Sequence, residues 1–434
     1  MLHFLLGMWP GFASIELDKA ACFEAVFPGQ PYDDKQFRYL SSNLYQLAEQ
    51  FWVAERQGLE TLRNETLLMD CLSQRNLEKE YRQTRRRMER HIKKKEAHNS
   101  EYFLQQLQWA EVEESHFERQ RIRQYDESIQ RVADNLDRYY HLRRLQFSCG
   151  MLDRQTIIKG DYELNISSHW LAHLQHQQFF GEPVIELYFT IFQALLDEED
   201  TTHFGRLQGM LAHHAANIAK ENLKDIYLFA INYCARKIRQ GKENYIGQAL
   251  QLYLDGIESE ILIDNGHLSP WAFTNVVKLA LRLRRYQWIE HFIQRYAPAL
   301  PDAFRENALH YNLAELYYYT RRFDLAQEHL NQVAFSDMNY YLGARVMLAK
   351  IYYETEATEP LLSLLAAFTI FLKRNKLIST DLKQTFLNFC DILFQIIKGK
   401  RRHWKKLGAK IRNTRLLTDR NWLLSIYGKA APGV

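Results

Sequence analysis

Leu313-Ala-Glu-Leu-Tyr-Tyr318 and Leu348-Ala-Lys-Ile-Tyr-Tyr353 are two copies of one pattern, 35 residues apart. A second pair, Arg284-Arg-Tyr-Gln-Trp-Ile289 and Arg321-Arg-Phe-Asp-Leu-Ala326, repeats with an offset of 37 residues. A period of this length is typical of a repeated helix pair. Each pair has an apolar face that only its neighbour can cover, so the sequence predicts stacked pairs in an α-solenoid.

The composition also favours helices. The chain has 434 residues but only 18 Gly and 9 Pro, and few turn formers indicate long helices with short connections. Its net charge of +4 is too small for a general nucleic-acid binder. We predict an all-α fold in four regions. These are an N-terminal helical region (1–70), a charged coiled-coil-like hairpin (71–145), helical repeats (146–397) and a basic capping segment (398–434).

The charged region contains two blocks of opposite sign. Residues 75–95 carry ten basic and three acidic residues, whereas residues 96–134 carry nine acidic and four basic ones. We expect a hairpin of two long helices that turns near His98, in which the acidic block offsets Arg85, Arg86 and Arg87. The alternative is that these arginines contact phosphates. A heptad seam, compatible with a closed hairpin or a homodimer, follows at Ile122, Tyr125, Ile129, Val132, Leu136 and Tyr139.

The stretch from Asn307 to Met338 resembles a tetratricopeptide (TPR) repeat. Leu313 and Ala314 stand where the family has its Leu and small residue, and Ala326 stands where the second helix crosses the first. At the matching position the next copy has Leu361 and the preceding copy has Ile289. Further matches are Tyr317, Leu330, Val333, Ala349 and Tyr352. The resemblance is clearest over residues 270–375.

The resemblance implies a groove, lined by the first helices, that binds a segment of a partner protein. By register the groove residues are Tyr311, Glu315, Tyr318, Tyr319, Val346, Lys350, Tyr353 and Glu354. Tyrosine suits such a surface because its rigid ring gives contact area and its hydroxyl forms hydrogen bonds. The alternative is that these tyrosines only pack between neighbouring helices.

The C-terminal segment is strongly basic. From Lys398 to Lys429 there are eleven basic residues and one acidic residue, Asp419. This segment either contacts nucleic acid or another acidic surface, or caps the solenoid with a polar face. The candidate phosphate-binding residues here are Lys400, Arg401, Arg402, Lys405 and Lys406.

No motif for catalysis or for a cofactor is found. His169, His173 and His176 share one helical face, but this spacing alone is a weak metal motif, and we assign no metal. The five cysteines form no CxxC pair, and no apolar stretch is long enough to span a membrane. We therefore predict a non-catalytic cytoplasmic scaffold or adaptor. The alternative is a nucleic-acid-associated protein that uses the basic clusters 75–95 and 398–429.

Overall fold

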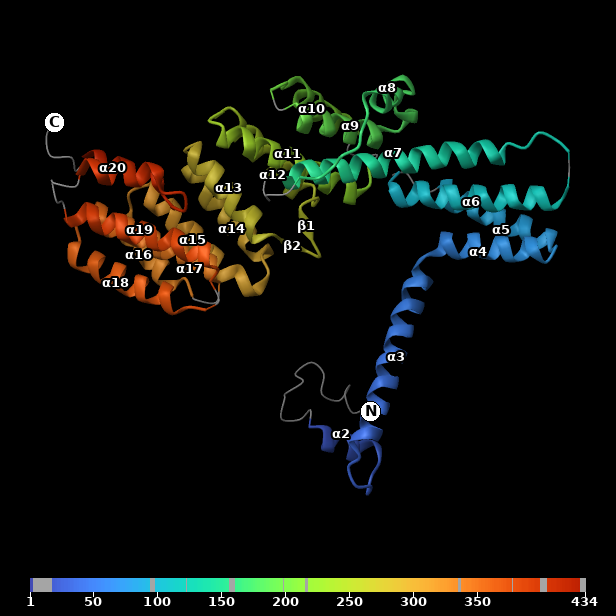
Figure 1. Cartoon of the computed structure of the whole chain (residues 1–434), viewed down its shortest axis with the longest axis horizontal. Helices are drawn as coiled ribbons and strands as arrows, with labels where there is room; N and C mark the ends of the chain where they lie inside the picture. The colour runs from blue at the N-terminus through green and yellow to red at the C-terminus, as the bar shows by residue number, and fades with distance from the viewer. Residues whose placement is uncertain are drawn as a thin grey trace. The chain divides into compact units, whose positions relative to one another are not determined.

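The computed structural model describes residues 1–2, 18–93, 98–121, 123–155, 161–197, 199–214, 218–334, 337–376, 378–398 and 404–429. The all-α prediction is confirmed: within these ranges nearly all regular structure is helical (Figure 1). The chain divides into two compact units, Met1–Asn222 and Leu223–Val434. Each unit is described separately below.

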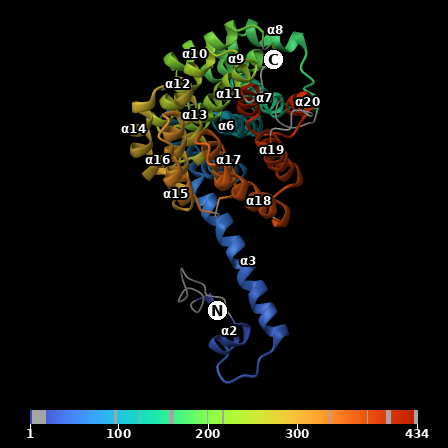
Figure 2. The ribbon, with the colours of Figure 1, turned by 90° about the vertical axis from the view of Figure 1, so that its left-hand side faces the viewer.

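The first unit contains a series of helices joined by short connections. They are α2 (Lys19–Val26), α3 (Asp34–Leu59), α4 (Thr61–Gln74), α5 (Glu78–Lys93), α6 (Ser100–Arg119), α7 (Ser128–Gln155), α8 (Ser168–His176), the 3-10 helix η1 (Gln178–Gly181), α9 (Pro183–Leu196) and α10 (Thr202–His214). Helix α6 packs against α4 and α7, and α7 packs against α9. Helix α3 is long (Figure 2). It begins behind an Asp33 cap and contains no buried residue among those described.

The region expected to form one charged hairpin is divided between two helix pairs. The first pair is α4 and α5, which turn at Asn76, and the second is α6 and α7. The expected heptad seam is not buried within the described residues: Ile129 is 63% exposed and Leu136 is 49% exposed, while Val132 and Tyr139 are half-buried. The stripe beside it, which includes Leu142 and Leu145, is buried instead.

The second unit begins within a helix that crosses the boundary between the two units. Its elements are α11 (Lys220–Arg239), α12 (Tyr245–Glu258), β1 (Ile263–Asp264), β2 (His267–Leu268), α13 (Pro270–Arg282), α14 (Tyr286–Tyr296), the 3-10 helix η3 (Ala297–Ala299), α15 (Asp302–Tyr319), α16 (Phe323–Gln332), α17 (Met338–Glu354), α18 (Thr358–Arg374), α19 (Thr380–Lys398), α20 (Trp404–Asn413) and α21 (Arg420–Lys429). The strands β1 and β2 pair antiparallel, with Ile263 opposite Leu268.

The same turn joins the two helices of several pairs. Gly241, Arg284, Arg321 and Glu356 all have a left-handed backbone, with φ between 56° and 86°. After each of them, the next backbone N–H donates to the carbonyl five residues earlier, as in a Schellman motif. These turns connect α11 to α12, α13 to α14, α15 to α16 and α17 to α18. The sequence repeat at Arg284 and Arg321 therefore reflects a repeated turn.

Small residues are buried where α15 and α16 pack. Ala314 on α15 and Ala326 on α16 are both fully buried, and α15 packs against α13, α16 and α17. Short side chains allow two helices to approach closely, which explains why alanine stands at both positions. Leu361 and Ile289, at positions that match Ala326, are buried too. The core continues through α18, α19 and α21. Phe389 on α19 and Leu423 on α21 are fully buried.

Candidate partner-binding groove

A cavity of about 400 Å³ lies among the first helices of successive pairs, α13, α15 and α17. We call it the groove cavity. It contains five of the six residues chosen as partner-binding by register, namely Tyr311, Glu315, Tyr318, Tyr319 and Lys350, and also Val346. The remaining lining comes from Lys278, Leu281, Arg282, Asn339, Gly343, Met347, Phe386, Thr418 and Asp419. The sequence register therefore identified side chains that lie around one space.

Glu315 is the buried acid of the groove cavity. Its side chain is 9% exposed, and within the described part of the chain its Oε2 atom has no hydrogen-bond partner. Burial raises the pKa of this carboxyl, and the nearby charges of Lys278 and Lys350 oppose that shift. A buried carboxyl without a partner is costly, so a ligand group that pairs with it would recover the lost hydrogen bond.

Lys350 crosses the cavity to the segment before α21. Its Nζ lies 2.7 Å from Asp419 Oδ1, 4.8 Å from the ring centre of Tyr318 and 5.7 Å from that of Trp422. Both partners of the ion pair are largely buried, with 16% and 29% of their side chains exposed. Lys350 therefore helps to hold the C-terminal segment against α17.

Tyr353, the sixth residue chosen from the sequence, contacts α21. Its ring meets that of Trp422 edge-on at 5.5 Å, and the Trp422 Nε1–H donates to Glu354 Oε1 at 3.0 Å. Burial raises the pKa of Glu354, but the hydrogen bonds from Trp422 and Arg321 outweigh it, so the pKa lies below its usual value. This end of the expected groove is already covered by the protein's own helix.

Gly343 makes room for the Tyr311 ring. A Cβ at position 343 would lie 2.9 Å from both Tyr311 Cε2 and its hydroxyl oxygen, closer than van der Waals contact permits. Burial also raises the pKa of Tyr311 far above its usual value, so its hydroxyl stays protonated. A side chain at position 343 would therefore require the Tyr311 ring to move from its place beside α17.

Three residues that line the groove cavity, from two places in the chain, could not be found from the repeat register. Lys278 and Arg282 lie four residues apart on α13, where the resemblance is weaker, and Asp419 comes from a segment beyond the repeats. The i, i+4 spacing of the two cations was the only signal for them. With Lys350, Glu315 and Asp419 they make the cavity strongly polar.

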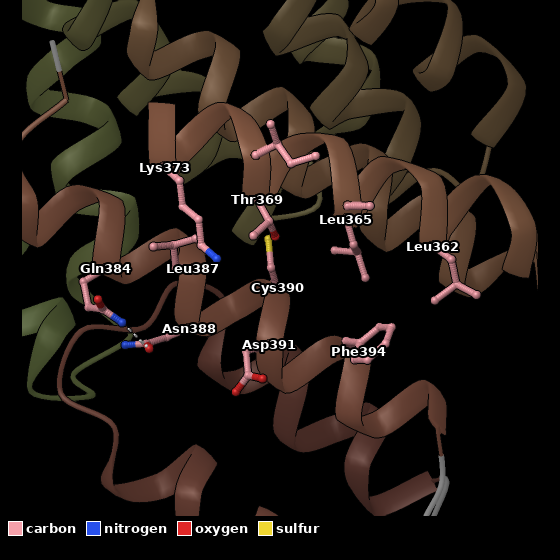
Figure 3. Close-up of a pocket in the computed structure, with 12 residues that line it drawn as sticks. Leu362, Leu365, Thr369, Lys373, Gln384, Leu387, Asn388, Cys390, Asp391 and Phe394 are labelled. Carbon is pink, nitrogen blue, oxygen red and sulfur yellow. Dashed lines mark hydrogen bonds between the residues drawn. The ribbon is translucent and has the colours of Figure 1, made fainter. Parts of the chain in front are cut away.

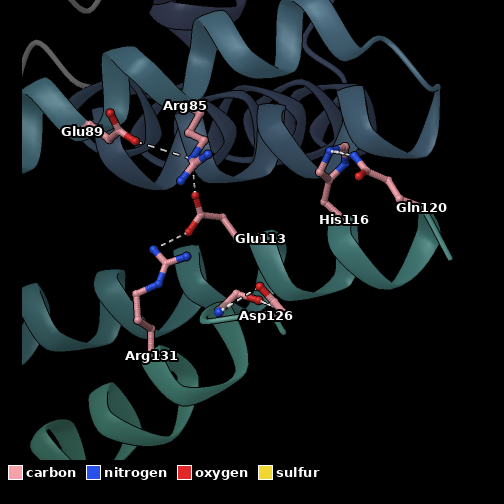
Figure 4. A network of polar contacts seen from close by, with 8 residues as sticks. Arg85, Glu89, Glu113, His116, Gln120, Asp126 and Arg131 are labelled. Atoms are coloured by element: carbon pink, nitrogen blue, oxygen red, sulfur yellow. Dashed lines mark hydrogen bonds and ion pairs between the residues drawn. The ribbon is translucent and has the colours of Figure 1, made fainter. Parts of the chain in front are cut away.

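Arg85, Arg86 and Arg87 lie on α5 in the first unit, and Figure 4 shows Arg85 with its partners. Arg85 Nε is 2.5 Å from Glu113 Oε1 on α6, and Arg131 on α7 reaches the other carboxylate oxygen at 2.7 Å. Arg87 pairs with Glu65 at 3.4 Å. Arg86 is exposed, and the described residues offer it no acidic partner. Two of the three arginines therefore form ion pairs inside the unit, one of them with the acidic block.

Some basic residues of the C-terminal segment make contacts within the second unit. Arg420 donates to the Ile411, Arg412 and Thr414 carbonyls at the end of α20, and Lys410 pairs with Asp391 at 2.5 Å. Lys405 and Lys406 are exposed and, within the described ranges, have no ion-pair partner. The candidates Lys400, Arg401 and Arg402 lie outside the described residues.

A second cavity, of about 620 Å³, lies between α18 and α19 (Figure 3). Leu362, Leu365 and Phe394 give it an apolar wall, with Lys373 and Asp391 among its polar residues. Cys390 also lines this cavity, but burial raises the pKa of its thiol to about 12. A thiol with that pKa stays protonated near neutral pH and is a poor nucleophile.

His169, His173 and His176 are exposed on α8. Among the described residues, no group of three or more His, Cys, Asp or Glu side chains is arranged to hold a metal ion. In the same part of the chain, none of the helices combines the length and apolar character needed to cross a bilayer. Comparison with protein-family models and with curated proteins finds no match.

Proposed function

We propose that this protein is a non-catalytic scaffold or adaptor that binds a segment of a partner protein in the groove cavity. In this proposal α11–α18 form a TPR-like solenoid, and the protein works in the cytoplasm. The observation that carries it is the convergence of Tyr311, Glu315 and Tyr319 with cations from two further helices around one cavity. A volume of about 400 Å³ suits one or two side chains of an extended segment.

The residues in the cavity suit a polar segment. Tyr319 is 51% exposed and presents both a ring and a hydroxyl to the cavity. Lys278 and Arg282 can bind carbonyl or carboxylate oxygens, and Glu315 can bind an N–H or a cation. Contacts of this kind fix the register of a bound chain, while the tyrosine rings supply contact area.

The test is affinity capture from the native host with the wild type and with Tyr319→Ala/Glu315→Gln. We expect the wild type to retain one stoichiometric protein partner and the double variant to lose it, a fall in affinity of at least tenfold. Phe304→Ala is the matched control, because Phe304 is an exposed aromatic residue on the same helix but does not line the cavity.

Equal binding by the wild type and the double variant would refute the groove. Retention of nucleic acid that is released at high salt, with no protein partner, would instead favour phosphate contacts at Arg86, Lys405 and Lys406. Binding that depends on basic residues neutralising phosphates weakens steeply as the ionic strength rises. Binding in an aromatic groove need not show this dependence.

A further inference from the structure

Helix α3 presents an apolar seam with the period of a coiled coil. Alternating steps of three and four residues separate Phe37, Leu40, Leu44, Leu47, Phe51 and Ala54. None of the described residues of α3 is buried, and Leu47 and Phe51 are 61% and 63% exposed. The C-terminal half of the seam, from Leu47 to Ala54, therefore lacks a partner within the described part of the chain.

This exposure is unusual for a long helix. In water an isolated helix owes little of its stability to propensity, and an amphipathic one is stabilised chiefly by packing its apolar face. Tyr45 and Trp52, each about 60% exposed, add exposed apolar side chains on another side of the same helix. Contiguous apolar surface of this kind on a folded protein marks an interaction site.

We infer that α3 pairs with the α3 of a second copy of this chain. A strict alternation of three and four over 18 residues is the pattern that lets one helix wind around another of the same period. The positions on one side of the seam, Gln36, Asn43, Gln50 and Gln57, are uncharged, and those on the other side are Ser41, Ala48 and Glu55. Since like charges at these positions would repel, neutral amides permit the helix to pair with itself.

The seam itself supplies a modest surface. Leu47 and Phe51 are more than 60% exposed, whereas Phe37, Leu40 and Leu44 are half-buried. Contacts of this size lie at the small end of specific interfaces, below about 1,200 Å² in total, so the dimer should dissociate in the micromolar range.

The competing surface is the heptad seam on α7. It also faces outward, but the part that lies on α7 runs only from Ile129 to Tyr139, about one and a half heptads, and Val132 and Tyr139 are already half-buried. The α3 seam is longer, and Glu55 is the one charged residue at its flanking positions. For these reasons α3 is the better self-association helix.

The test is the mass of the full-length protein in solution, measured by sedimentation equilibrium from about 1 to 50 µM. The wild type is expected to approach twice the chain mass, and Leu47→Glu/Phe51→Glu to remain at the mass of one chain, with a dissociation constant raised at least a hundredfold. Ser42→Glu/Gln46→Glu is the matched control, since it adds the same charge to the opposite face of α3. It should dimerise like the wild type.

A third variant separates the two helices. Ile129→Glu/Leu136→Glu alters the α7 seam, and it should dimerise normally if α3 forms the interface. A wild type that is monomeric throughout this concentration range would overturn the inference. Dimerisation lost in the α7 variant but retained in the α3 variant would overturn it as well. Since all of these substitutions lie in the Met1–Asn222 unit, the thermal midpoint of the Leu223–Val434 unit should be equal in every variant.

Discussion

Replacing Glu113 with Gln is expected to destabilise the Met1–Asn222 unit. Glu113 is 6% exposed and lies between Arg85 on α5 and Arg131 on α7, at 2.5 and 2.7 Å (Figure 4). The amide has the shape of the carboxylate but lacks its charge. The two guanidinium groups would then face each other without the anion between them, and helices α5, α6 and α7 would lose a common contact.

The size of the effect follows from the burial of each partner. Removing one partner of a buried ion pair costs about 3–5 kcal/mol, but both arginines are about 40% exposed and can return to water, so we expect about 2 kcal/mol. In a unit of this size each kcal/mol lowers the thermal midpoint by about 2–4 °C, which predicts a fall of about 4–8 °C.

Differential scanning calorimetry of the full chain measures the midpoint, and hydrogen exchange followed by mass spectrometry shows whether α6 loses protection. Glu111→Gln is the control, because Glu111 is exposed on the same helix and the described residues give it no ion pair. If the two variants unfold at the same temperature as the wild type, Glu113 does not join the three helices as the distances indicate.

Two further predictions concern titration and reactivity. Burial lowers the pKa of His141, so between that pKa and about 6.5 the unfolded chain binds more protons and stability falls as the pH is lowered from 7 to 5. His141→Phe keeps a ring against Phe180, and its thermal midpoint should fall less between pH 7 and 5 than that of the wild type. If the two midpoints fall equally, other groups cause the pH dependence. Iodoacetamide should label native protein at Cys71 alone, because the other four cysteines are buried, and a second labelled site in the mass spectrum would contradict this burial.

The repeat core could be predicted from the sequence because its signal is local. A close helix contact requires small residues, which Ala314 and Ala326 provide. The tyrosines of the first helices recur at a fixed spacing. The turns were harder to recognise. Arg284, Arg321 and Glu356 adopt a left-handed backbone that usually selects glycine, so only Gly241 has the residue type expected for this turn.

The charged region shows where periodicity misleads. Ile129, Leu136 and their neighbours form an apolar stripe, but the structure buries the adjacent stripe of α7, which includes Ser128 and Leu142. Polar residues are acceptable on that buried side because Arg131, at the same face, pairs with Glu113 on α6. A hydrophobic pattern alone does not reveal that a neighbouring helix supplies the matching charge.

Only some of the residues that line the groove cavity could be predicted from the sequence, for a related reason. Tyr311, Glu315 and Tyr319 follow from the register of one repeat, whereas Asp419 reaches Lys350 across 69 residues of sequence. No periodic pattern connects positions that far apart. The same distant segment determines which part of the groove is open, because Trp422 covers Tyr353 and Glu354.

This arrangement changes what each tyrosine can do within the proposed function. Tyr353 supports the packing of α21, so its replacement by Ala would first loosen the C-terminal helix and would not report on binding alone. Tyr319 is exposed and lines the cavity beside Arg282, so its replacement removes contact surface at little cost in folding. A partner segment that enters the cavity must therefore bind the side formed by α13 and α15, and the pair of Tyr319 and Glu315 is the sharper test of the groove.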